Sequence, residues 1–312
     1  MIKKMLLKFS RLLKEISYFL DKLNNRIITY FNIKSDNSFA TFKFEGDRKV
    51  KLPPISLFSV FYRDASFKNT IMFYSRSDAE PLLRKIVFDL YQKKLINPQN
   101  SLIDIGSWLG DNSLIWASML ENEGRVFSID PSHSNLAYSR ELAKMNKIEN
   151  ITWIEEVCAE KEGITLDYEG SIDHTSFIRG KNSKGSLISS SLDALMAKEG
   201  NPEIGLLHVD VEGFELSVLK GAKNIIKDFM PVIIYEQHIS KQDSSLVSTY
   251  LKSFGYRVFM INEVLPICDL DCRNFIALNN SIDNSYIENF YESKARKHGV
   301  FSAAVGSTLI EV

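Results

Sequence analysis

The chain has 312 residues, which is enough for one domain of about 200–250 residues with extensions. Its apolar and charged fractions, 45% and 25%, are typical of globular proteins, and a net charge of −1 argues against an overall basic field for nucleic acid. Three cysteines are too few for a disulfide framework, and no run approaches about 20 apolar residues, so a disulfide scaffold and a membrane span are both excluded.

Residues 1–34 are predicted to form an amphipathic helix, because apolar residues recur in steps of three and four from Ile2 to Leu23. The other face of this helix is mostly basic. The helix either packs on its own domain or on a second copy of the chain, or it lies on an anionic membrane surface. Lys8 breaks the apolar run and no small-residue cleavage site follows, so we expect no export signal and a cytoplasmic protein.

Residues 35–98 are expected to form a cap over the main domain. Short β-like runs lie within residues 36–75, and helical spacing returns at Pro81–Lys94, where a proline suits the first helical turn. At the other end of the chain, residues 281–312 form an extension that carries no motif for a ligand.

Residues 99–280 are predicted to form one α/β domain in which strands and helices alternate. Each strand is a short apolar run followed by turn or helix-start residues, as expected for strands buried on both faces. The predicted parallel strands are 101–105, 125–130, 151–156, 204–210 and 231–236. A closing pair, Arg257–Ile261 and Asn274–Leu278, predicts an antiparallel hairpin, whereas residues 160–192 are expected to form a hairpin or a loop over the sheet. The fold class is therefore a doubly wound, Rossmann-like sheet that is mostly parallel.

A glycine-containing loop, Asp104 to Gly110, follows the first strand at the sheet edge where open α/β folds bind ligands. Its pattern is Asp-x-Gly-x-x-x-Gly, which differs from the Gly-x-Gly-x-x-Gly of a dinucleotide site. The Asp104 carboxylate would repel a pyrophosphate, whereas it would attract the ammonium and sulfonium groups of S-adenosylmethionine (SAM). The loop therefore favours SAM over NAD, and the expected cofactor contacts are Asp104, Gly106, Ser107 and Gly110.

Two further strand ends suit the rest of this cofactor. Asp130 ends the second strand, where a carboxylate can accept both ribose hydroxyls; the alternative is that it caps the helix predicted over Asn135–Lys144. Cys158 follows the third strand, whose end would lie beside the adenine. It is either a wall of the adenine pocket or a buried structural thiol.

A dense acidic motif, Asp210-Val-Glu212-Gly213-Phe-Glu215, follows the fourth strand and leads into Leu219-Lys-Gly-Ala. Pro231 to Glu236, Ser191-Leu-Asp193 and Asp130-Pro131 accompany it in order along the chain. Together these motifs resemble the signature of the FkbM family of SAM-dependent methyltransferases over roughly residues 100–280. The resemblance implies a class I methyltransferase fold, SAM as cofactor, and O-methylation of a hydroxyl on a small-molecule or carbohydrate acceptor.

The chain departs from this family at two places. Ser107-Trp108 stands where the family usually has Ala-Asn after the first glycine, and Asp130 stands in place of the usual glutamate. The first change bears on side-chain contacts of the loop and leaves its backbone cradle intact. The second keeps the carboxylate and shortens its reach.

Four residues are the predicted catalytic set: Asp210, Glu212, Glu236 and His238. Asp210 and Glu236 end neighbouring strands and should face the methyl group, so Asp210 is also an expected cofactor contact. The set either deprotonates a substrate hydroxyl, with His238 or Asp210 as the base, or binds Mg²⁺ or Mn²⁺, or serves the structure alone. A divalent cation is not expected, and His208, in the buried strand, is expected to be a core histidine.

Two other classes of protein stay open at this point. A NAD-dependent oxidoreductase is disfavoured by Asp104 and by the missing third glycine. A SAM-binding adaptor that has lost catalysis and oligomerises through its N-terminal helix is disfavoured by the intact acidic set. The near-neutral charge and the absence of an Asn/Asp-Pro-Pro-Tyr motif after the fourth strand argue against a nucleic-acid acceptor.

Overall fold

The computed structural model describes residues 39–43, 49–54, 80–120, 124–171, 174–177, 185–238, 245–261, 272–282 and 309–312. The chain divides into two compact units, residues 1–79 with 265–270, and residues 80–264 with 271–312. In the first unit, β1 (Phe39–Lys43) and β2 (Lys49–Pro54) form an antiparallel hairpin within the region predicted to be β-like. The helix predicted over residues 1–34 lies outside the described residues.

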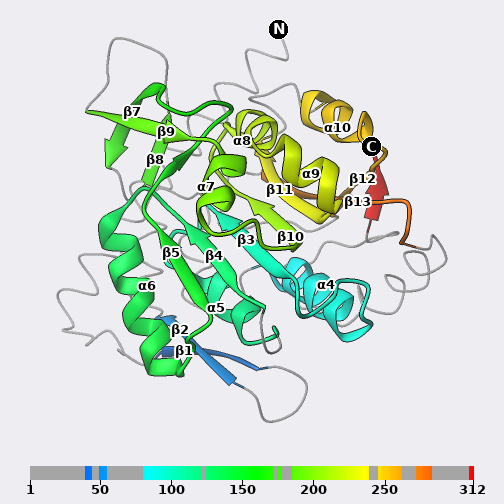
Figure 1. The fold of residues 1–312 in the computed structure, drawn as a ribbon. Coiled ribbons are helices and arrows are strands. Elements are labelled where there is room, and N and C mark those ends of the chain that lie inside the picture. The colour runs from blue at the N-terminus through cyan, green and yellow to red at the C-terminus, as the bar shows by residue number, and fades with distance from the viewer. Residues whose placement is uncertain are drawn as a thin grey trace, which may run out of the picture. The chain divides into compact units, whose positions relative to one another are not determined.

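The second unit is built on an eight-stranded sheet (Figure 1). Its strand order is β14-β12-β13-β11-β10-β3-β4-β5. The strands are β3 (Ser101–Ile105), β4 (Val126–Ile129), β5 (Ile151–Ile154), β10 (Ile204–Val209), β11 (Val232–His238), β12 (Arg257–Ile261), β13 (Cys272–Leu278) and β14 (Leu309–Glu311). Pairing is parallel from β11 to β5 and antiparallel from β11 through β13 and β12 to β14. The predicted class, a mostly parallel doubly wound sheet with a C-terminal antiparallel hairpin, is confirmed.

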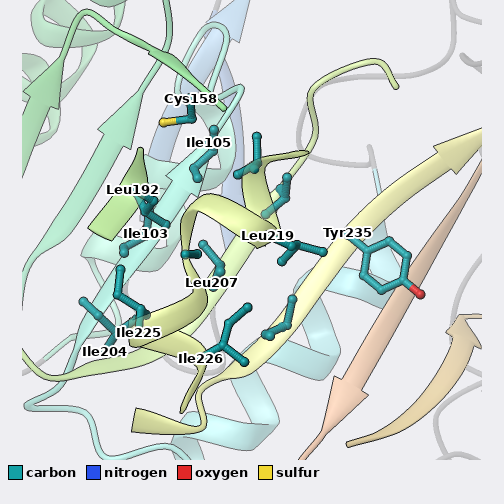
Figure 2. Packing of buried hydrophobic residues seen from close by; sticks show 14 of the residues in the cluster. Ile103, Ile105, Cys158, Leu192, Ile204, Leu207, Leu219, Ile225, Ile226 and Tyr235 are labelled. Carbon is teal, nitrogen blue, oxygen red and sulfur yellow. The ribbon is translucent and has the colours of Figure 1, made fainter. Parts of the chain in front are cut away.

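Helices cover both faces of this sheet. They are α4 (Pro81–Gln92), α5 (Asp111–Ala117), α6 (His133–Asn146), α7 (Leu192–Lys198), α8 (Glu215–Gly221), α9 (Lys223–Phe229) and α10 (Ser245–Lys252). Apolar residues of α7, α8, α9 and α10 pack with Ile103, Leu207 and Ile233 in one buried cluster, part of which is shown in Figure 2. Helices α4 and α5 lie on the other side of β3 and β10 (Figure 1).

Strand alternation explains why polar side chains of the central strands lie on the face of the sheet covered by α4 and α5. Successive side chains of a strand point to opposite faces, so Ile103 and Leu207 face α7 to α10 while Asp104 and His208 face α5. Asp104 and His208 are also direct neighbours in the parallel ladder between β3 and β10. This alternation places the polar side chains of the central strands between the sheet and α5. They lie next to the loop from Asp104 to Gly110, the predicted cofactor loop.

Residues 157–190 add a second, four-stranded sheet of order β6-β9-β7-β8. Its strands are β6 (Val157–Cys158), β7 (Thr165–Ser171), β8 (His174–Phe177) and β9 (Gly185–Ser190). A hairpin was one of the two alternatives predicted for this segment, and β7 and β8 form it. No helix in the described part of the chain combines the length and the apolar character that a membrane span requires.

Candidate functional site

The loop after β3 fits tightly against the end of β10. Gly106 has φ 75°, and a Cβ there would stand 1.7 Å from the Asp210 carbonyl oxygen. Gly110 has φ 70°, and a Cβ there would stand 2.9 Å from the Ser139 hydroxyl of α6. Both positions therefore require glycine, for the positive φ and for space. The loop backbone is held at the sheet edge, where Gly106 and Ser107 donate their N–H groups to the Ile129 carbonyl.

Asp104 lies beneath this loop and is almost completely buried. Its Oδ1 is 2.8 Å from Nδ1 of His208, and its Oδ2 accepts a hydrogen bond from the Ser113 hydroxyl of α5. Both carboxylate oxygens therefore contact protein groups that join β3, β10 and α5. The predicted contact of Asp104 with the SAM ammonium stays a prediction. His208 is the buried core histidine that was expected, with the edge of Trp116 against its ring.

Asp130 connects the loop to the end of β4. It accepts hydrogen bonds from the backbone N–H groups of Trp108 and Ser132, both at 2.9 Å, and from the Asn135 amide at 3.2 Å. Burial raises the pKa of Asp130 to about 6, although these three hydrogen bonds oppose the shift. The N-cap of α6 is Ser132, whose hydroxyl accepts from the Asn135 N–H, so the alternative of Asp130 as the cap is wrong.

Backbone strain gathers at this edge of the sheet. Among the described residues other than glycine, those with positive φ include Glu80, Trp108 and Glu212, with φ of 49°, 48° and 51°. They lie just before α4, in the cofactor loop and two residues after Asp210. The others follow helices α4, α6, α7 and α9, where the left-handed conformation is common. Strained residues that do not end a helix often mark functional sites.

Cys158 is buried in the cluster that includes Ile105 and Leu192 (Figure 2). Burial, with a smaller contribution from the Glu156 charge, raises the pKa of its thiol to about 12. The thiol is therefore protonated at neutral pH and unreactive, as expected for a structural cysteine. Its predicted place beside the adenine stays a prediction.

The four predicted catalytic residues come together where β10 and β11 end. Glu212 follows Asp210 on the turn after β10, and its Oε2 is 3.1 Å from Nε2 of His238 on β11. Burial is the main reason why the pKa of Asp210 lies well above its ordinary value. Neighbouring carboxylates raise it further, and these belong to Glu236, Glu212, Glu80 and Glu215. The site is thus strongly acidic and partly removed from water.

The same cluster has a composition that a divalent cation accepts. One ligand atom from each of Glu212, Glu236 and His238 lies within 4.8 Å of the others. Two carboxylates and an imidazole suit Mn²⁺ or Mg²⁺. Nε2 of His238 and Oε2 of Glu212 also form a direct hydrogen bond, which needs no ion.

The sequence interpretation missed the polar residues at the start of α4. Glu80 accepts hydrogen bonds from the side-chain amides of Asn112, at 3.1 Å, and Asn274, at 2.7 Å. Arg84 is completely buried; its Nη2 is 2.6 Å from Asp111, and its Nε donates to Asn112 at 2.8 Å. The available signal was an arginine within the apolar stripe of the predicted helix, a position that requires a buried partner.

Comparison with known proteins identifies the domain. The model of the methyltransferase FkbM domain matches residues 104–258, from Asp104 to the second residue of β12. No curated protein matches the chain.

Several solved structures of methyltransferases are similar to parts of the chain. A methyltransferase FkbM from Methylobacillus flagellatus KT is 18% identical with a TM-score of 0.44; the match covers 57% of this chain and 43% of that one, less than half of its length. A methyltransferase from Geobacter sulfurreducens is 12% identical over 81% of this chain and 97% of that chain, with a TM-score of 0.38. A putative O-methyltransferase from Klebsiella pneumoniae is 11% identical over 63% and 78%, with a TM-score of 0.40.

The matched segment contains the features that carried the resemblance in the sequence. These are the glycine loop, Asp130, the acidic motif that begins at Asp210, and Glu236 at the end of β11. Through residues 104–258, the chain therefore belongs to the FkbM family of SAM-dependent methyltransferases.

Proposed function

We propose that this chain transfers the methyl group of SAM to a hydroxyl of a small-molecule or carbohydrate acceptor. One observation carries the proposal: the cofactor loop and the acidic cluster meet, because Gly106 lies directly against the Asp210 backbone. A methyl group held by the loop would thus be next to groups able to accept a proton. In this proposal residues 99–280 are the catalytic domain, whereas the predictions for residues 1–34, 35–98 and 281–312 fall largely outside the described residues and stay predictions.

The residues at the edge of the sheet fit the parts of SAM. The loop backbone from Gly106 to Gly110, including Ser107, would hold the methionine portion, and the Asp130 carboxylate would accept the ribose hydroxyls. Cys158 would lie near the adenine, and Asp210 near the sulfonium. Asp104 would act from below the loop, by holding Ser113 and His208. When bound, SAM supplies an electrophilic methyl group, and the protein supplies alignment and a base.

His238 is the proposed base. It is buried, and the Glu212 carboxylate 3.1 Å away would stabilise the imidazolium that forms when His238 takes the hydroxyl proton. Asp210 is the second candidate, because its raised pKa makes it a better proton acceptor than an exposed aspartate. Glu236 adds negative charge beside Asp210, which favours a cationic sulfonium in this position.

Calorimetric titration of the full chain with SAM, S-adenosylhomocysteine (SAH) and NAD tests the cofactor. We expect SAM and SAH to bind and NAD to show no heat of binding. Binding of NAD in their place would show that the protein is an oxidoreductase. Binding of SAH without transfer of labelled methyl to any compound in a panel of alcohols, sugars and amines would favour an adaptor.

A further inference from the structure

We propose that Glu80 is a positioning residue of the methyl-transfer site, which holds the helix after the cofactor loop and the strand beside Glu236 at a fixed separation. Glu80 precedes the matched family domain, so the family assignment does not reach it. The inference rests on the proposed function, because it concerns the same site.

The Glu80 carboxylate joins two distant parts of the chain. Its Oε2 accepts a hydrogen bond from Asn112, the second residue of α5, which follows Gly110 of the cofactor loop directly. Its Oε1 accepts from Asn274, which is paired with Glu236 across β13 and β11. Because cross-strand partners leave a sheet on the same face, Asn274 accompanies Glu236 toward the site. One side chain thus connects the cofactor side of the site with its acidic side.

The partners of Glu80 are themselves fixed. The Asn112 Oδ1 accepts a hydrogen bond from the completely buried Arg84, one turn along α4 from Glu80, so the Asn112 amide is held at both ends. Asn274 is almost completely buried in the central sheet. Two buried amide donors that point to one carboxylate define its place closely.

A role for Glu80 in stabilising its own helix does not explain these contacts. Glu80 is the N-cap of α4, yet its side chain forms no capping hydrogen bond to that helix. Its backbone is in the left-handed region, with φ 49° and ψ 46°, which is unfavourable for a glutamate. Such strain persists where surrounding contacts determine the conformation, and here these contacts lie across the site.

Electrostatics also places Glu80 at the site. Its charge is one of the four that raise the pKa of Asp210, together with those of Glu236, Glu212 and Glu215. Glu80 is therefore near Asp210 as well as bonded to the helix that follows the loop. A displacement of this carboxylate would affect the cofactor loop and the acidic cluster together.

The test compares Glu80→Gln with the double variant Glu80→Gln, Asn112→Asp. Glutamine keeps one acceptor oxygen for Asn274 and presents an NH2 group to the NH2 group of Asn112, so one hydrogen bond is lost. In the double variant that NH2 group meets an aspartate, which restores the hydrogen bond and the net charge beside Arg84. Glu141→Gln is the control, because Glu141 is an exposed carboxylate on α6 that pairs with Lys144.

The readouts are the dissociation constant of SAH by calorimetry and the free energy of unfolding in urea. We expect Glu80→Gln to weaken SAH binding about tenfold, the double variant to regain most of that loss, and the control to change nothing. A purely structural role would lower the unfolding free energy of Glu80→Gln and leave SAH affinity unchanged, which would overturn the inference. Weak SAH binding that the double variant does not restore would also overturn it.

The two proposals fail in different ways. If the natural chain binds no SAH, the proposed function is wrong. If the natural chain binds SAH and Glu80→Gln binds it equally well, only the positioning role is wrong. Should Glu80→Gln fail to fold, the double variant decides alone. If the double variant binds SAH as tightly as the natural protein, the swapped hydrogen bond is supported. If it folds but binds SAH tenfold more weakly, the positioning role is contradicted.

Discussion

The Cα of Gly106 lies so close to Asp210 that a Cβ added there would stand 1.7 Å from the Asp210 carbonyl oxygen. Two segments that are about a hundred residues apart in the sequence, the cofactor loop and the acidic motif, are therefore in backbone contact. Under the proposed function, this contact would bring the methyl donor and the proton acceptor to one place.

Substitution of Gly106 tests this contact. Gly106→Ala should abolish measurable SAH binding, because the loop must shift to relieve both the clash and a positive φ. Gly163→Ala is the matched control: Gly163 has φ 73°, but a Cβ there meets nothing within 4 Å. The control should lose about 1 kcal/mol of stability and keep its SAH affinity. Equal SAH affinity in both variants would show that the loop tolerates displacement.

Replacement of the proposed base should separate chemistry from binding. His238→Ala should lower the rate of methyl transfer by a factor of about 10²–10⁴. SAH affinity should stay within a few-fold of that of the natural protein, because binding of SAH involves no proton transfer to the base. Asp210→Asn should weaken SAM binding more than SAH binding, because only SAM carries the sulfonium charge. His133→Ala, at an exposed histidine paired with Glu155, is the control. If His238→Ala keeps full activity, Asp210 becomes the base to test.

The raised pKa of Asp130 predicts a pH-dependent stability. Because its pKa is about 6 in the folded protein and near 4 when exposed, the protonated carboxyl favours folding. This contribution is complete below the unfolded pKa and is lost as the pH rises through about 6. Over that interval the natural protein should lose at most roughly 3 kcal/mol relative to Asp130→Asn, measured as urea unfolding at several pH values. Parallel pH curves for the two proteins would contradict this.

The same carboxyl should give SAH affinity a pH dependence opposite to that of folding stability. Only the ionised form of Asp130 can accept hydrogen bonds from both ribose hydroxyls, so SAH affinity should rise as the pH increases through about 6. Asp130→Asn should bind SAH weakly and without this rise. A natural protein whose SAH affinity is flat between mildly acidic and neutral pH would place the ribose elsewhere.

The buried ion pair between Arg84 and Asp111 should be important for stability. Arg84→Ala would leave the Asp111 carboxylate buried without its guanidinium, which is expected to cost about 3–5 kcal/mol in the free energy of unfolding. Lys144→Ala, at the exposed pair with Glu141, should cost less than about 1 kcal/mol. Similar losses in both variants would indicate that the Arg84 environment is more hydrated than its burial implies.

Removal of metal ions should leave the protein active. His238 and Glu212 form a direct hydrogen bond without an ion, and the base mechanism needs no ion. We therefore expect SAH affinity and methyl transfer to survive exhaustive chelation. Activity that disappears after chelation and returns with Mn²⁺ would instead assign the cluster of Glu212, Glu236 and His238 to a metal.

Local pattern determined the secondary structure of the central domain closely. The strands predicted at 101–105 and 257–261 have those bounds as β3 and β12, and the strand predicted at 204–210 ends one residue earlier as β10. These are short apolar runs between clear turn residues, so their signal is contained in neighbouring residues. The weaker signal lay in β6, β7, β8 and β9, where the serine- and glycine-rich segment 160–192 shows no regular alternation. There the sequence supported only a hairpin or a loop.

By itself the sequence determined the class of fold, the family and the position of the cofactor loop, because glycines, strand-end acids and apolar runs act through their immediate neighbours. The tertiary structure alone decided what the side chains contact. Asp104, whose contact with the cofactor stays a prediction, holds His208 and Ser113, while Glu80 contacts Asn274 from far along the chain. Such contacts depend on strand order and on which helix covers which face. No local pattern encodes them, since they arise only when the whole sheet assembles.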